Sequence, residues 1–322
     1  MIECSGTCAR MKDNCNAVHF EASNNTCSLA QLILLEELPE EEAFPVFIET
    51  QAFNSLEQKE NFLLIGQGID KVQSYPCNFT LPIGNIDFQL GGIAVLKGKI
   101  HIYNFKTNKC YHRSMVLSGP WDETPDCVTP ARNSPTMTTV GENILMTGGY
   151  VESSSSSLDT IESFDGTTWT TLSTKLSRPR IAHCSVGISY TEMIVLGGMN
   201  GPWQMRLVEK YDADGNMIET LPNLITGRGY FGCGFYQGEI YAAGGNGMSS
   251  VEVYNMQSKR WRAIANLKSN VLFPNFHVYK EKLTMFGSDN SIQIYNGETW
   301  EFASESLKNN FYRGVSVKVP CH

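Results

Sequence analysis

The sequence predicts an all-β repeat fold, and three observations support this prediction. Three short segments that each end in two glycines recur along the chain: ILMTGG at 144–149, MIVLGG at 193–198 and IYAAGG at 240–245. A degenerate fourth copy, LTMFGS at 283–288, follows them. Neighbouring copies lie about 45 residues apart, a period typical of repeat architectures. The chain also has 28 glycines and no long helical periodicity, which favours short strands joined by tight turns.

Each repeat predicts one antiparallel sheet of four strands, because it contains four short segments that alternate apolar with polar residues. In the clearest copy, Arg228 precedes a first strand YFGCGFY, and IYAAGG forms the second strand. SVEVYN at 250–255 is the third strand, and the fourth begins at Trp261. Three further copies occupy residues 132–175, 180–221 and 275–302.

Two degenerate units come before these copies. Residues 90–128 keep the fourth-strand tryptophan as Trp121 but have Asn104 and Phe105 in place of the double glycine. Residues 62–81 supply only a second and a third strand, and residues 309–320 supply a lone first strand. We therefore expect the two ends of this region to share one sheet, which gives six sheets and leaves no free sheet edge to aggregate.

The paired glycines, a later aromatic residue (Phe164 or Tyr211) and a tryptophan such as Trp169 resemble the kelch repeat. The resemblance covers residues 61–319, and the predicted domain comprises residues 61–322. It implies an all-β, six-bladed kelch-type β-propeller that is closed by the C-terminal strand. We expect the aromatic side chains to fill the space between neighbouring blades.

Residues 1–35 form a small cysteine-rich unit. Cys4 and Cys8 would share one face of a helix, and NAVHFE at 16–21 and the segment around Cys27 predict two strands. The order C-x3-C, CNAVHFE and C-x-L resembles the centre of the PAN/Apple module. The resemblance implies a disulfide-rich α+β fragment in which Cys4 pairs with Cys27 and Cys8 with Cys15. A zinc cluster is the alternative, but no C-x2-C pair is present.

Residues 36–60 predict an acidic linker, since they hold eight glutamates and one lysine out of a chain whose net charge is −8. Residues 61–322 have no net charge and do not favour nucleic-acid binding, which needs a basic face. No apolar run is long enough to span a membrane. The ten cysteines and the glycosylation sequons at Asn24 and Asn78 favour an extracellular protein. Because no signal peptide is visible, we expect that it was lost by truncation at the N-terminus.

Four other cysteines predict two disulfides in the propeller. Cys110 would begin the third strand of its blade and Cys127 would end the fourth, so the two would be neighbours in an antiparallel pair. Cys77 and Cys321 would lie at the same end of the first blade and would lock the closure of the ring.

Two cysteines and two histidines are predicted to lie on inner strands. Cys184 and Cys233 are expected to be buried thiols. His183 and His277 would approach the central channel, where the galactose oxidase family builds a copper site on a kelch propeller. The sequence lacks that family's appended domains and any motif around these histidines, and it shows no other catalytic constellation. We therefore expect no catalytic residue, metal or cofactor.

One set of residues predicts a binding site at one end of the channel. It comprises arginines near the start of a first strand, tyrosines beside two of them, and a tryptophan that the repeat does not need: Arg132, Arg180, Arg228, Arg313, Tyr230, Tyr312 and Trp203. Arginine and tyrosine carry binding energy at interfaces. The alternative for the arginines is structural: each would bond carbonyl groups of the adjacent blade.

The sequence thus predicts a non-catalytic extracellular binding module, a monomeric propeller that recognises a protein or glycan through loops at one end. An intracellular kelch adaptor, cytoskeletal or part of a ubiquitin ligase, is the alternative. A copper enzyme like galactose oxidase is a third possibility with less support.

Overall fold

The structure is a computed structural model, and its description covers the following residues: 18–21, 26–29, 60–65, 71–76, 80–82, 90–115, 120–124, 127–128, 130–308 and 315–320. Over these residues the regular structure consists of strands, with no helix. The chain divides into two compact units, Met1–Glu57 and Gln58–His322.

The first unit contains a two-stranded antiparallel sheet. Strand β1 (Val18–Glu21) pairs with β2 (Thr26–Leu29), and Phe20 lies opposite Cys27. Both strands lie within the segments predicted to form them. The predicted helix with Cys4 and Cys8, the cysteine at position 15 and the sequon at Asn24 lie outside the described residues, as does the side chain of Cys27.

The second unit consists mainly of six four-stranded antiparallel sheets. The first combines β30 (Val315–Pro320), β3 (Glu60–Ile65), β4 (Lys71–Tyr75) and β5 (Thr80–Pro82). The next two are β6 (Leu90–Leu96), β7 (Lys99–Asn104), β8 (Lys109–Ser114), β9 (Asp122–Thr124), and β10 (Thr136–Val140), β11 (Asn143–Thr147), β14 (Thr160–Phe164), β15 (Trp169–Lys175).

The last three sheets follow in chain order. They are β16 (Cys184–Gly187), β17 (Glu192–Leu196), β20 (Val208–Asp212), β21 (Met217–Leu221); β22 (Gly232–Tyr236), β23 (Glu239–Ala243), β24 (Val251–Asn255), β25 (Arg260–Ile264); and β26 (Asn275–Tyr279), β27 (Lys282–Phe286), β28 (Ile292–Tyr295), β29 (Trp300–Phe302). Two small hairpins, β12 (Tyr150–Val151) with β13 (Ser156–Ser157) and β18 (Met199–Asn200) with β19 (Trp203–Gln204), extend from the loops that follow β11 and β17.

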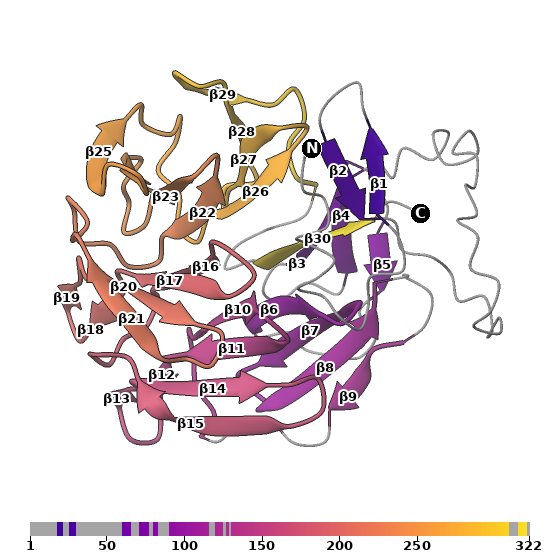
Figure 1. The fold of residues 1–322 in the computed structure, drawn as a ribbon, viewed down its shortest axis with the longest axis vertical. Helices are drawn as coiled ribbons and strands as arrows, with labels where there is room; N and C mark the ends of the chain where they lie inside the picture. Colours follow the sequence, from indigo (N-terminus) through magenta and orange to yellow (C-terminus); the bar gives the residue numbers. More distant parts are fainter. Residues whose placement is uncertain are drawn as a thin grey trace. The chain divides into compact units, whose positions relative to one another are not determined.

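The sheets of the second unit are arranged around a common centre (Figure 1). Their first strands contact one another in the order β6, β10, β16, β22, β26 and β30, and β30 contacts β6 again. The ring is closed by the pairing that the sequence predicts between the two ends of this region: β30 lies antiparallel to β3, with Leu63 opposite Val317. The closing strand therefore has partners where it would otherwise be a free edge.

The hydrophobic core lies between neighbouring sheets, as expected for the repeat aromatics. Phe164 stacks on Trp169 with ring centroids 4.9 Å apart and packs against Leu96 of the preceding sheet. Tyr254 packs against Ile194, again one sheet earlier. Because each aromatic side chain fills the space between two sheets, the repeats stabilise one another rather than folding alone.

The double glycines connect each sheet to the next. The N–H of Gly149 donates to the carbonyl of Arg180 at 2.9 Å, and the N–H of Gly198 donates to the carbonyl of Arg228 at 2.8 Å. Gly198 has a φ of 101°, and a Cβ there would lie 2.9 Å from the carbonyl oxygen of Ile181. Only glycine allows this backbone conformation and this close approach.

Candidate binding surface

The three described arginines of the predicted binding set are buried. The guanidinium of Arg180 is within 2.5 Å of Glu209, which lies on the third strand of the same sheet. It also donates to the carbonyl of Gly197, at the end of the second strand. Arg132 and Arg228 repeat the arrangement with the following groups: Glu162 at 2.7 Å and Gly148, and Glu252 at 2.8 Å and Gly244.

This geometry corrects the prediction that Arg132, Arg180 and Arg228 bind a ligand. Each of their side chains is at most 1% exposed, so a ligand has no access to the guanidinium groups. The structural alternative is nearer to the finding but also needs a correction. The guanidinium groups bond within their own sheet, and the main-chain carbonyls of Arg180 and Arg228 accept hydrogen bonds from the preceding one.

The other members of the predicted set differ in position. Tyr230 is half-buried, its ring packs edge-on against Phe273, and its N–H donates to Ala182 of the preceding repeat. Its main-chain contacts indicate a connecting role between repeats. Tyr312 and Arg313 lie outside the described residues.

Trp203 is the one described member of the set that is accessible. It lies in the hairpin of β18 and β19, opposite Asn200, and is 77% exposed. The hairpin belongs to the face formed by the loops that lead into the first strand of each sheet and out of the second. We call this side of the ring the loop face.

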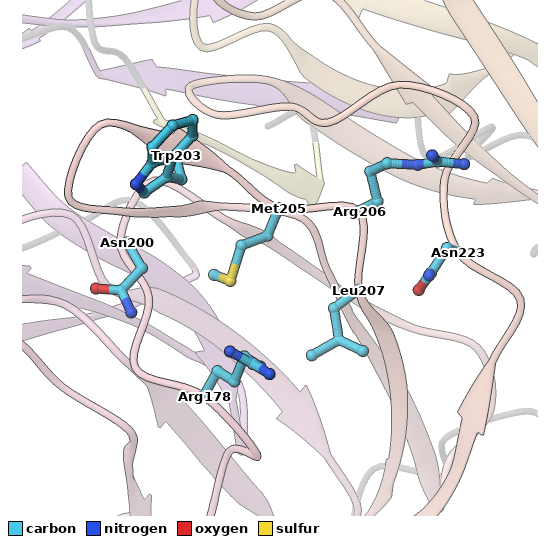
Figure 2. A pocket seen from close by; sticks show the side chains of 7 residues that line it. All are labelled: Arg178, Asn200, Trp203, Met205, Arg206, Leu207 and Asn223. Carbon is cyan, nitrogen blue, oxygen red and sulfur yellow. The ribbon is translucent and has the colours of Figure 1, made fainter.

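A pocket of about 490 Å³ opens beside Trp203 on the loop face. Figure 2 shows Met205 and Leu207 in the middle of the pocket, with Trp203, Arg178 and Arg206 around them. Two asparagines complete the lining, Asn200 and Asn223. The lining comes from two neighbouring repeats, because Arg178 precedes β16 whereas Asn223 precedes β22.

Of the residues that line this pocket, only Trp203 was predicted from the sequence, although the repeats carry a signal for the two arginines. Counting from the buried arginines, the position of Arg178 is occupied by Pro130 and Thr226 in two other repeats. Counting back from the buried glutamates, the position of Arg206 is occupied by Asp159 and Ser249. Both arginines therefore occupy positions at which the fold does not require arginine.

The central channel holds polar groups that bond to one another. The Thr138 and Ser185 hydroxyls bond across two neighbouring sheets at 2.5 Å, and His277 bonds to Ser316 at 2.7 Å. Burial lowers the pKa of His277 to about 4. His183 bonds Thr147 at 2.8 Å, and burial holds its pKa well below the ordinary value. Both histidines therefore make local hydrogen bonds.

Within the described part of the chain, no group of three or more histidine, cysteine or acidic side chains is placed to hold a metal ion. No helix among these residues has the length and apolar character needed to cross a membrane.

Two disulfides link cysteines among the described residues of the second unit. Cys110 and Cys127 are bonded as predicted, with Cα atoms 5.5 Å apart. Cys184 and Cys233 form a second disulfide, which corrects the expectation of two buried thiols. They lie on the inner strands β16 and β22, whose contact brings residues 49 positions apart in sequence together. The predicted partners Cys77 and Cys321 and the sequon at Asn78 lie outside the described residues.

Comparison with known proteins agrees with this architecture. Residues 227–268 match the Kelch motif family. The second unit is a β-propeller that carries a Kelch motif. A solved structure titled "Structure of YjhT" matches the propeller with a TM-score of 0.61 at 12% identity, covering 70% of this chain and 86% of that one. At such low identity this likeness shows the fold alone.

Among curated proteins, the F-box/kelch-repeat protein At1g30090 of Arabidopsis thaliana is 31% identical over 143 residues. The alignment covers 39% of this chain and 36% of the relative, so the chain spans about a third of the length of that protein.

Proposed function

We propose that this protein is a non-catalytic binding protein that recognises another protein through the loop face of its propeller. The observation that carries the proposal is Trp203, which is 77% exposed and lies beside a pocket with an apolar floor. Tryptophan is enriched among the residues that contribute most of the binding energy of protein interfaces, and ligands bind preferentially in pockets. Kelch propellers in general bind protein partners, and this supports the same proposal.

Affinity capture with the full chain tests the proposal. Wild type, Trp203→Ala and the control Phe302→Ala are immobilised at equal density, and the captured proteins are compared by quantitative mass spectrometry. Phe302 is 57% exposed, lies on the outermost strand of its sheet, β29, and is outside the pocket beside Trp203. We expect a set of proteins that Trp203→Ala loses and Phe302→Ala retains. If Trp203→Ala captures the same set as wild type, the loop face near Trp203 is not the interface.

We further propose an extracellular location. The Cys110–Cys127 and Cys184–Cys233 disulfides support it, because disulfides persist in oxidising compartments. The intracellular adaptor remains the second candidate, and the F-box/kelch name of the relative favours it. Peptide mapping of the protein from its native source, with free thiols alkylated before lysis, separates the two. Alkylated cysteines at these positions would rule out the extracellular proposal, and glycans on Asn24 or Asn78 would support it.

Our proposal for the assembly is a monomeric propeller in which the six four-stranded sheets are six blades. The contact order of the first strands and the pairing of β3 with β30 support it. For residues 1–35 we keep the PAN/Apple-like module as a proposal, supported by the pairing of β1 with β2. Light scattering after size exclusion tests the monomer: a mass of two chains would contradict it.

A further inference from the structure

The pocket beside Trp203 contains two arginines that differ from the buried ones. Arg132, Arg180 and Arg228 each pair with a buried glutamate. Arg178 and Arg206 are exposed, and neither forms an ion pair with any carboxylate in the described part of the chain. The Nε of Arg206 donates to the carbonyl of Leu224, which fixes the side chain and leaves its other donors open to solvent.

The pocket has an apolar floor between these positive charges. Met205 and Leu207 form the floor, and Trp203 forms one wall (Figure 2). Methionine and leucine offer a surface for an apolar side chain, and methionine adapts to different shapes. At the rim, Asn200 and Asn223 offer amide donors and acceptors that suit the backbone of a peptide.

The charge of the lining is one-sided. The lining contains two arginines and no acidic residue. The equivalent of Arg206 in another repeat is Asp159, which pairs with Lys175. At this pocket the chain therefore presents positive charge without an internal partner. Guanidinium groups bind carboxylates with two parallel hydrogen bonds, so a carboxylate is the complementary group.

We propose that this pocket binds a peptide segment of a partner protein in which a large apolar side chain lies next to a carboxylate. The apolar side chain occupies the floor formed by Met205 and Leu207, and the carboxylate bonds to Arg178 or Arg206. The inference rests on the proposed function, because it names the chemistry of the partner at the same face. The apolar floor favours a peptide over a glycan, whose hydroxyl groups would lose hydrogen bonds to water there.

Selection from a displayed library of random 12-residue peptides tests the inference. The full chain is immobilised as wild type, Arg178→Glu, Arg206→Gln and the control Arg260→Gln. Arg260 is an exposed arginine on the outermost strand β25 and lies outside the pocket. We expect wild type and Arg260→Gln to enrich peptides that combine an acidic residue with a large apolar one. Arg178→Glu should lose this enrichment.

The affinities of the selected peptides give the second measurement. Each enriched peptide is compared with a version in which its carboxylates are replaced by amides. We expect about a tenfold loss for the amide version and for Arg206→Gln, the magnitude of one charge-assisted hydrogen bond. Thermal unfolding of each variant should match wild type, because the substituted side chains are exposed.

Three outcomes of the peptide experiments would overturn the inference: no enriched peptide, enriched peptides without acidic residues, or equal losses for Arg260→Gln. A glycan array run in parallel detects the other class of ligand, and a glycan bound in place of peptides also overturns it. Failure here is distinguishable from failure of the proposed function. If Trp203→Ala abolishes protein capture but no acidic peptide is selected, the protein-binding face stands and the carboxylate chemistry is wrong.

Discussion

Arg228 and Glu252 form an ion pair inside the propeller, with the guanidinium Nε 2.8 Å from the carboxylate. The same guanidinium donates to the carbonyls of Gly244 and Ser250, and the carboxylate accepts the N–H groups of Ile225 and Thr226. The pair therefore links the loop before the first strand to the second and third strands of one sheet. Its buried charges have hydrogen-bond partners on both sides, as burial of an ion pair requires.

Removing one partner of this pair should destabilise the propeller strongly. We expect Arg228→Met to lower the free energy of unfolding by about 3–5 kcal/mol, because Glu252 is left as an unpaired buried charge. Arg228→Met combined with Glu252→Leu should be less destabilised than the sum of the single variants, as measured by urea denaturation. A change in the free energy of unfolding within about 0.5 kcal/mol for Arg228→Met, the range typical of surface substitutions, would contradict a stabilising role of the ion pair.

The double glycine should tolerate no side chain at its second position. In Gly198→Ala the new Cβ would lie 2.9 Å from the carbonyl oxygen of Ile181, and the backbone at this position has a φ of 101°. Gly201 is the matched control, since it also has a positive φ of 59° but has open space around its Cβ position. We expect about 1–2 kcal/mol of destabilisation for Gly201→Ala and a clearly larger loss for Gly198→Ala, measured by urea denaturation. Equal losses would show that the contact with Ile181 relaxes easily.

The disulfide between neighbouring inner strands should stabilise the ring. Loop-closure entropy for the 49-residue separation of Cys184 and Cys233 predicts a loss of about 4 kcal/mol in Cys184→Ser/Cys233→Ser. The shorter Cys110–Cys127 loop, with a separation of 17, predicts about 3 kcal/mol for its own double variant. Urea denaturation of both double variants against wild type measures the losses. Reduction of wild type, which breaks both bonds, should lower stability by more than either double variant does, and unchanged stability under reducing conditions would contradict the prediction.

The stability of the propeller should fall in mild acid, partly because of His101. Burial, with a contribution from His112, lowers the pKa of His101 to about 4, whereas the unfolded chain has a value near 6.5. The unfolded state therefore binds more protons between these values, and stability decreases as the pH falls through this window. We expect the loss between pH 7.5 and pH 5 to be about 2 kcal/mol smaller in His101→Gln than in wild type.

Denaturant titrations at both pH values measure this difference. His183 and His277 also have lowered pKa values, so the variant should keep part of the wild-type pH dependence. Parallel curves for wild type and His101→Gln would contradict the assignment to His101.

The pattern within each repeat was accessible from the sequence because it depends on local chemistry. Alternation of apolar and polar residues placed the strands, and the spacing of Cys110 and Cys127 within one predicted blade was enough to pair them. The lone strand at the C-terminus and the incomplete first unit also implied their pairing. The alternation within a strand and the match between the lone C-terminal strand and the incomplete first unit are properties of short segments. They can therefore be recognised without knowledge of the packing.

Only the tertiary structure decided what happens between repeats. The sequence placed Arg180 at one end of the channel, but the structure shows the guanidinium turned inward onto Glu209. Cys184 and Cys233 meet because two inner strands are neighbours, which sequence spacing does not reveal. In the same way, Asn223 joins Trp203 in one pocket because loops of two repeats converge there. Side-chain direction and contacts between sheets depend on how the sheets are packed in three dimensions. The double glycines therefore predicted the ring, whereas the packing of its sheets determined which side chains are accessible.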